Sequence, residues 1–248
     1  MIILSISFLI TAILYSSVGF GGGSTYLALL IIWDIPYYII PVIALLCNII
    51  VVSGNSFNYV KAGNHNFKLL IPFLIGSIPL AFLGGTLVIN KEIFEILLFL
   101  VLSFAGLLLL ANNKSYGDKK IIIKKINVLI SIFLGSILGL ISGIVGIGGG
   151  IFLSPILFLL KADKPKNIAT TASLFILINS LSGVIGQFTK EIVLKEITFY
   201  WPLFFTVFIG GLIGNYLNLK IFSNRMLALI TSLLVIFVAL RMAFKIFI

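Results

Sequence analysis

Two glycine-rich stretches decide the fold, VGFGGG at residues 18–23 and VGIGGG at residues 145–150. Each interrupts an apolar run and is followed by about ten further apolar residues. Because a glycine in a helix interior costs about 1 kcal/mol relative to alanine, three in succession predict a helix end or a broken helix. Broken helices inside a membrane line cavities, since their freed N–H and C=O groups still need partners. We therefore expect the two breaks to face each other.

The composition is that of a membrane protein. Of the 248 residues, 60% are hydrophobic and 10% are charged, and the mean hydropathy is +1.26. A soluble domain of this length cannot bury that much apolar surface, so the sequence predicts an all-α integral membrane protein in contact with the lipid bilayer. The net charge of +10 comes from lysines in short loops, which favours topology over a nucleic-acid partner. The single Cys47 predicts no disulfide framework and no metal cluster, and we expect no cofactor.

Ten apolar segments follow one another along the chain. They lie at about residues 2–18, 24–33, 38–60, 68–90, 93–111, 128–145, 151–160, 166–188, 198–219 and 226–247. A spanning helix needs roughly 20 residues, so the second and seventh segments are predicted to be half-helices or strongly tilted helices. Asp34 with Pro36, and Asp163 with Pro165, predict the starts of the helices that follow.

The two halves of the chain match as a repeat. The glycine triplets lie 127 residues apart, Ser53-Gly54 matches Ser182-Gly183 at an offset of 129, and Gly84 matches Gly214 at 130. We therefore divide the chain into a first membrane repeat (1–111), a basic linker (112–127) and a second membrane repeat (128–248). Five segments per repeat is an odd number, so the repeats are predicted to be inverted, each with a glycine-broken helix pair.

The basic residues predict the topology. With the linker on the cytoplasmic side, twelve basic residues lie inside and five lie outside. Trp33, Tyr200 and Trp201 then fall at the outer interface, where such rings anchor. The sequence thus predicts a multi-pass protein of a prokaryotic plasma membrane with both termini outside. A homo-oligomer is compatible with this arrangement.

Backbone groups are the main candidates for binding a substrate. All seven acidic residues lie in loops or at helix ends, which disfavours a buried carboxylate relay, cation transport and membrane enzyme chemistry. Half-helices that start at the breaks would present free N–H groups and a partial positive charge to an anion. These N–H groups belong to Gly22, Gly23, Ser24 and Thr25, and to Gly149, Gly150, Ile151 and Phe152. Close helix packing is the alternative role of such glycines.

Side chains near the breaks complete the predicted site. Hydroxyls follow the first break and open the eighth segment, and a mid-membrane Asn is costly unless it is bonded or reaches water. The predicted substrate-binding residues are Gly21, Gly22, Gly23, Ser24, Thr25, Gly148, Gly149, Gly150, Thr171, Ser173, Asn48 and Asn179.

The glycine motifs resemble those of the TauE/SafE family of sulfite exporters. The resemblance rests on residues 18–23 and 143–150, with support from ATTAS at 169–173 and the glycines at 210, 211 and 214. It implies a transporter, typically an exporter, for sulfite, organosulfonates or related sulfur oxyanions. The first half departs from the pattern, because Pro41-Val-Ile-Ala44 stands where the second half has the Thr/Ser run.

The sequence therefore predicts a secondary transporter for small anions that works by alternating access around two facing glycine breaks. It is not expected to be an enzyme. A passive anion channel and a non-transporting membrane scaffold stay open as alternatives.

Overall fold

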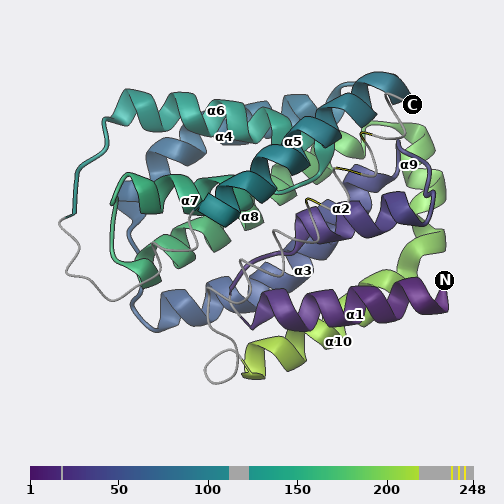
Figure 1. The fold of residues 1–248 in the computed structure, drawn as a ribbon, viewed down its shortest axis with the longest axis horizontal. Coiled ribbons are helices and arrows are strands. Elements are labelled where there is room, and N and C mark those ends of the chain that lie inside the picture. Colours follow the sequence, from purple (N-terminus) through teal and green to yellow (C-terminus); the bar gives the residue numbers. More distant parts are fainter. Residues whose placement is uncertain (18, 112–122, 218–235, 237–239, 241–242, 244–248) are drawn as a thin grey trace.

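The computed structural model describes residues 1–17, 19–111 and 123–217, together with residues 236, 240 and 243. All regular secondary structure in these residues is helical (Figure 1). The elements are α1 (Ile2–Ser16), α2 (Gly23–Ile32), α3 (Ile40–Lys61), α4 (Phe67–Thr86), α5 (Lys91–Ala111), α6 (Val128–Val145), α7 (Gly150–Leu159), α8 (Pro165–Gln187), α9 (Glu191–Glu196), the 3₁₀ helix η2 (Ile197–Tyr200) and α10 (Trp201–Leu217). Five helical stretches are long and apolar enough to cross a membrane. The predicted all-α membrane class is confirmed at this level.

The predicted half-helices are present in the structure. Helices α2 and α7 have ten residues each and begin at Gly23 and Gly150, directly after the glycine clusters. The predicted segment 198–219 begins within η2 and continues as α10 to Leu217. Helix α9 precedes it, and the three elements together form one apolar stretch from Glu191 to Leu217. The predicted last segment, 226–247, lies outside the described residues apart from three positions.

One of the two predicted Asp/Pro helix starts is wrong. Asp34 has a φ of 52°, in the left-handed region, and the N-cap of α3 is Ile39, three residues after Pro36. The chain therefore makes a turn before α3 begins. Pro165 does open α8, but Asp163 lies one residue before the N-cap and its carboxylate accepts from the next backbone N–H at 2.7 Å.

Helices α3 and α8 pack against each other inside the bundle. They run antiparallel, because Ser56 meets Ser173 near one end while Leu45 lies against Gly183 near the other. Helix α4 packs against α6 and α8, and α10 packs against α1 and α3. The first helix of each half is thus paired with a helix of the other half, α1 with α10 and α6 with α4. The two halves are interleaved around the α3–α8 pair.

Glycines on α6 allow the close approach of α4. A Cβ at Gly135 would meet the backbone carbonyl of Phe73, and a Cβ at Gly139 would meet that of Ser77. These positions are one helical turn apart on each helix, so the backbones stay in contact along the interface. Small residues of this kind are typical of helix–helix interfaces in membranes.

Hydrogen bonds join loops of the two halves at both ends of the bundle. At one end, the Tyr38 hydroxyl donates to the Glu196 carboxylate of α9 at 2.8 Å. At the other end, Asn66 Nδ2 donates to Asp163 Oδ2 at 2.6 Å. The predicted topology places each of these pairs on one side of the membrane, and the pairings agree with it. Which side is cytoplasmic stays a prediction.

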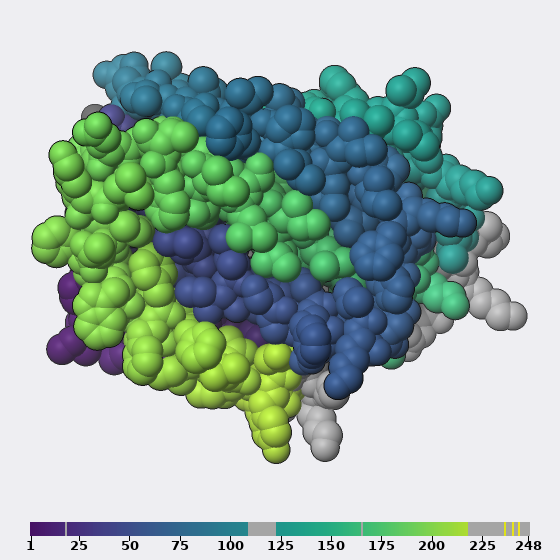
Figure 2. Space-filling model, turned by 180° about the vertical axis from the view of Figure 1, so that it is seen from behind, coloured from purple at the N-terminus to yellow at the C-terminus, as the bar shows by residue number. Residues whose placement is uncertain are grey.

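The outer surface of the bundle is apolar. Figure 2 shows α3 reaching this surface between α10 and α8. Its Phe57 is 67% exposed, and large apolar side chains on the neighbouring helices, including Ile185 of α8 and Phe208 of α10, are also exposed. In a soluble protein such a surface would aggregate, whereas a bilayer covers it.

Candidate functional site

The first break joins α1 to α2 through residues 17–22, of which 18 is not described. Gly19 and Gly22 have φ angles of 84° and 83°, in the left-handed region that residues with a Cβ rarely adopt. Gly22 is the N-cap of α2. The glycines therefore make a turn that lets α2 restart in a new direction.

The second break joins α6 to α7 through residues 146–149. Gly146 caps α6 with a φ of 89°, and its N–H donates to Ser142 O at 2.8 Å. Gly148 and Gly149 follow with φ angles of 80° and 75°, and Gly149 is the N-cap of α7. Both short helices thus begin from a left-handed glycine.

The two breaks are in contact with each other. A Cβ built on Gly23 would lie 2.5 Å from the backbone oxygen of Ile147. Gly23 opens α2 and Ile147 lies within the second break, so the start of α2 abuts the end of α6. Gly23 and Ile147, which are 124 residues apart in the sequence, are therefore in direct contact in the fold.

Part of each helix N-terminus is satisfied within its own first turn. The Thr25 N–H donates to Gly22 O at 3.0 Å, and the Phe152 N–H donates to Gly149 O at 3.2 Å. The prediction that Thr25 and Phe152 present free N–H groups is therefore wrong. These bonds are of the i to i−3 type that tightens helix ends.

Three of the four predicted N–H groups remain at the start of each short helix. Those of Gly22, Gly23 and Ser24 at α2, and of Gly149, Gly150 and Ile151 at α7, have no acceptor among the described residues. Each helix N-terminus also carries a partial positive charge of about half a unit. The two starts together therefore favour negative charge between them.

Asn48 of α3 lies between the two breaks. Its Oδ1 would be 2.5 Å from a Cβ on Gly21, and its Nδ2 would be 2.7 Å from one on Gly23 and 2.8 Å from one on Gly148. Asn48 is 0% exposed, and neither its Oδ1 nor its Nδ2 has a hydrogen-bond partner among the described residues. A buried amide left unbonded costs about 1–3 kcal/mol, so Asn48 lowers the stability of the fold at this position.

Helix α8 supplies the wall opposite Asn48. The Ile176 side chain lies over Gly150 and Gly148, and Ser180 Oγ would be 3.3 Å from a Cβ on Gly148. Ser180 is buried, and its hydroxyl has no partner among the described residues. The sequence analysis missed Ser180. It lies four residues after Ile176 and seven after Ser173, which places all three on one helix face.

The other predicted side chains divide into two groups. Three hydroxyl or amide groups are bonded within the protein: Thr25 Oγ1 to the Tyr15 hydroxyl at 2.7 Å, Ser173 Oγ to Ser56 Oγ at 3.0 Å, and Asn179 Nδ2 to Phe175 O at 2.9 Å. Ser24 Oγ, Thr171 Oγ1 and Asn179 Oδ1 are buried without a partner among the described residues. Of the twelve predicted positions, those in direct contact around Asn48 are Gly21, Gly23 and Gly148.

Comparison with known proteins gives a consistent family. The profile described as sulfite exporter TauE/SafE matches residues 3–242. The chain belongs to the TauE/SafE sulfite exporter family. It is 26% identical over 240 residues, 96% of each chain, to a probable membrane transporter protein of Sinorhizobium fredii. It is 33% identical over 194 residues, 73% of this chain and 70% of the relative, to a probable membrane transporter protein of Methanocaldococcus jannaschii. No solved structure matches the chain.

Charged groups are scarce inside this TauE/SafE family member. Among the described residues Asp163 is the buried charged one, and it lies in the loop between α7 and α8. Within the same part of the chain, no cluster of three His, Cys, Asp or Glu side chains could hold a metal ion. The polar contacts around the breaks therefore come from backbone, amide and hydroxyl groups.

The site between the breaks is closely packed in this structure. Two cavities of about 180 and 250 Å³ lie in the described part of the chain, and neither is lined by a glycine of the breaks. Both open beside the loop between α2 and α3. Because Asn48 is fully buried and lies close against Gly21, Gly23 and Gly148, a ligand between the breaks would require these groups to separate.

Proposed function

We propose that this protein is a secondary transporter for small anions, namely sulfite, organosulfonates or related sulfur oxyanions, and that it works by alternating access around the two glycine breaks. One observation carries the proposal. The N-termini of α2 and α7 retain free N–H groups on either side of Asn48, whose amide is buried and unbonded. Hydrogen-bond donors preorganised in this way suit a tetrahedral or pyramidal oxyanion.

The packing supports movement between two states. Each half contributes one helix to the other, and the α3–α8 pair lies between these interleaved units. Hydrogen bonds between the halves close the bundle at both ends. Inverted repeats that rock about a midplane site are a known architecture of secondary transporters. We assign the repeats to residues 1–111 and 128–248, the linker to the cytoplasmic side and the membrane to the plasma membrane.

The absence of a membrane-embedded acid among the buried described residues suits an anion as cargo. We take export as the direction because the family is described as sulfite exporters. The partners of the protein in this proposal are the anion and the bilayer.

Counterflow of radiolabelled sulfite in proteoliposomes tests the proposal. We expect saturable exchange that unlabelled sulfite or a sulfonate inhibits and chloride does not. Trans-stimulation separates a carrier from a passive channel. A folded protein without exchange of any of these anions would refute the proposed cargo.

A pair of glycine variants tests the site itself. Gly148 has a φ of 80° and its Cβ would lie 2.8 Å from Asn48 Nδ2, whereas Gly63 has a φ of 72° with no atom within 4 Å. Ala at either position adds a similar left-handed strain of about 1–2 kcal/mol. Gly148→Ala should therefore abolish exchange, while Gly63→Ala retains it. Equal activity of the two variants would remove the breaks from the mechanism.

A further inference from the structure

Beyond the breaks, the larger cavity has the features of an anion site. It has a volume of about 250 Å³ and lies between the α2–α3 loop, the α4–α5 loop and the start of α9. Roughly 15 Å³ is enough to hold one water, so the cavity has room for a small ion with part of its hydration shell. The described lining residues are Tyr37, Tyr38, Pro41, Leu87, Val88, Ile89, Phe94, Ile144, Gln187, Lys190 and Ile192.

Lys190 is the charged residue among those that line the cavity. Its ammonium group donates to Gln187 Oε1 at 3.0 Å, and no other acceptor for it occurs among the described residues. An ammonium group has three N–H donors, so two remain for a ligand. The remaining described lining is apolar apart from Gln187 and the hydroxyls of Tyr37 and Tyr38. A positive charge in such a setting attracts an anion more strongly than an exposed lysine does.

Partial burial also affects the protonation of Lys190. Desolvation lowers the pKa of its ammonium group from 10.5 to about 8. The neighbouring titratable groups are the phenols of Tyr37 and Tyr38, with Glu196 bonded to Tyr38 and Glu191 next in sequence. The adjacent smaller cavity, which shares Tyr37 and Phe94, is lined by Asp34, Lys91 and Glu95. None of these acids lines the cavity of Lys190.

The cavity is linked to the second break. Gln187, which holds Lys190, donates through Nε2 to Gly143 O at 2.8 Å, three residues before the break begins. Pro41 lines the cavity and also lies directly against Gly146 of the break. Pro41 and Gln187 therefore connect the cavity to the second break.

We propose that the Lys190 cavity is a second anion-binding site, which holds a small sulfur oxyanion or sulfonate at the α9 end of the bundle. The bound anion contacts the Lys190 ammonium group and displaces water from an apolar chamber. Passage of the anion between this cavity and the glycine breaks rests on the proposed transport function. Binding of the anion in the cavity does not depend on that function.

Amine acylation in the purified protein tests the binding. Lys190 and Lys195 are labelled with an N-hydroxysuccinimide ester below pH 8, with or without sulfate or methanesulfonate, and peptide mass spectrometry gives each rate. Only the neutral amine reacts, and an adjacent anion raises a lysine pKa by one unit or more. Sulfate should therefore slow Lys190 labelling about tenfold, the factor that one pKa unit represents.

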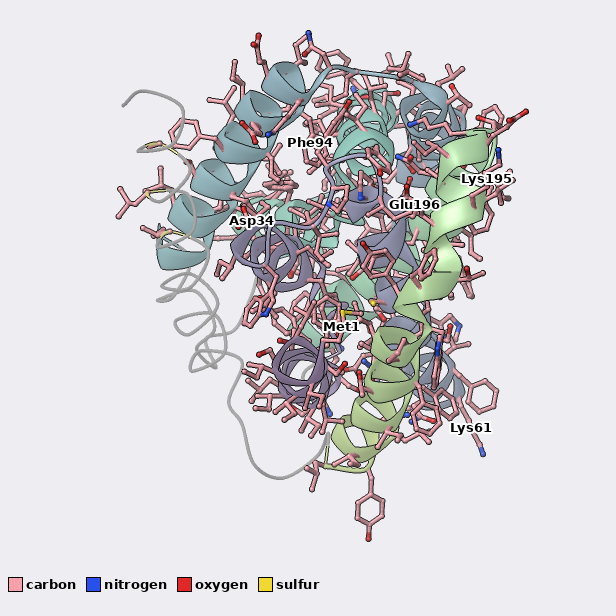
Figure 3. All side chains as sticks on the ribbon, turned by 90° about the vertical axis from the view of Figure 1, so that its right-hand side faces the viewer. Met1, Asp34, Lys61, Phe94, Lys195 and Glu196 are labelled. Atoms are coloured by element: carbon pink, nitrogen blue, oxygen red, sulfur yellow. The ribbon has the colours of Figure 1, made fainter. Side chains whose placement is uncertain are left out.

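Lys195 is the matched control. It lies on the same side of the bundle, and Figure 3 shows it directed outward where Glu196 is directed inward. Its side chain is 79% exposed. An unchanged Lys190 rate, or equal slowing of Lys190 and Lys195, would overturn the proposal.

The same assay in Asn48→Leu separates this site from the breaks. Protection of Lys190 should persist in this variant, because the cavity does not include Asn48. Protection that disappears would show that sulfate acts through the breaks and would overturn a separate site. Protection of Lys190 in a wild-type protein that exchanges none of the tested anions would refute the proposed function and leave the Lys190 site in place.

Flux measurements give a second test of whether the positive charge of Lys190 contributes to anion binding. Lys190→Gln should raise the KM for the anion supplied from the α9 end with little change in kcat, whereas Lys195→Gln should change neither. At neutral pH, Lys190→Arg should have the KM of the wild type. At about pH 9 the wild-type Lys190 amine is neutral and no longer attracts the anion, so the KM of the wild type should rise. The KM of Lys190→Arg should stay unchanged, because arginine keeps its charge. A wild-type KM in Lys190→Gln would contradict a site on the transport route.

Discussion

The Tyr38 hydroxyl lies 2.8 and 2.9 Å from the two carboxylate oxygens of Glu196. This contact joins the loop before α3, in the first half, to α9 in the second half. At the opposite end, the Asn66–Asp163 hydrogen bond joins the α3–α4 loop to the α7–α8 loop. In the proposed alternating-access mechanism, opening of the α9 end separates Tyr38 from Glu196, and opening of the other end separates Asn66 from Asp163.

Tyr38→Phe should therefore favour opening of the α9 end. The variant keeps the ring and its packing with Tyr37 and removes only the hydroxyl. A hydrogen bond contributes about 1 kcal/mol net, so the open population should rise up to about fivefold. The acylation rate of Lys190 measures this opening, because Lys190 lines the cavity beside Tyr38.

Tyr37→Phe is the matched control for this experiment. It removes the neighbouring hydroxyl and leaves the bond between Tyr38 and Glu196 in place. Its Lys190 labelling rate should equal that of the wild type. Equal rates in all three proteins would exclude the Tyr38–Glu196 contact as a gate.

Asn48→Leu should separate stability from transport. Leucine has the same number of side-chain heavy atoms as asparagine, so it fits the space between the breaks and removes an unbonded buried amide. The free energy of unfolding should rise by about 1–3 kcal/mol. Counterflow of sulfite should be lost, because the side-chain group between the two helix N-termini is gone.

Asn58→Leu is the matched control, because Asn58 carries a bonded amide on the same helix. Asn58 Nδ2 donates to Asn215 Oδ1 at 2.9 Å at the far end of α3. This variant should lose a fraction of a kcal/mol to about 1 kcal/mol of stability and keep its counterflow. An active Asn48→Leu protein would mean that the amide serves packing alone.

The sequence predicts most of the fold because its strongest features are local. A membrane span is set by the length of an apolar run, and a glycine cluster breaks a helix wherever it occurs. The starts of α2 and α7 therefore follow from residues 18–23 and 145–150 alone. The start of α3 does not, because the left-handed turn at Asp34 has no distinctive residue pattern.

The site is only partly predictable because it depends on how helices are rotated about their axes. The cost of a buried amide identifies both Asn48 and Asn179. In the structure Asn48 is directed to the glycines, whereas Asn179 bonds back to Phe175 of its own helix. The partner of Thr25 is Tyr15, across the break, and no local pattern indicates it. Ser180 was missed for the same reason.

Stability should depend on pH through Lys190. Its pKa is about 8 in the folded protein and near 10.5 when unfolded, so between these values the unfolded chain binds more protons. Stability therefore rises with pH across this window, as the desolvated charge is removed. Solvent screening reduces this change in the free energy of unfolding, because the Lys190 side chain is only partly buried.

The midpoint of thermal unfolding measures this dependence without bound anion. The wild type should gain stability relative to Lys190→Gln as the pH rises from about 8 to 10. Other lysines titrate in both proteins, so the difference between them isolates Lys190. A constant difference across the window would contradict the lowered pKa. Saturating sulfate should flatten the wild-type dependence, since it stabilises the charged form.

The last prediction concerns the close approach of α4 and α6. A Cβ at Gly139 would meet the backbone of Ser77, whereas a Cβ at Gly211 has Val51 Cα as its nearest neighbour, at 3.8 Å. Both glycines are helical, and alanine is favoured over glycine in a helix by about 1 kcal/mol. Gly211→Ala should therefore raise the free energy of unfolding by up to about that amount.

Gly139→Ala gains the same helix propensity but forces the backbones of α4 and α6 apart. Overpacking of this kind costs about 1–3 kcal/mol, so the variant should be less stable than the wild type. Reversible unfolding in mixed micelles would measure both variants. The opposite signs are the test: if Gly139→Ala were stabilised as much as Gly211→Ala, α4 and α6 would not be in backbone contact, and the interleaving of the two halves would have to be revised.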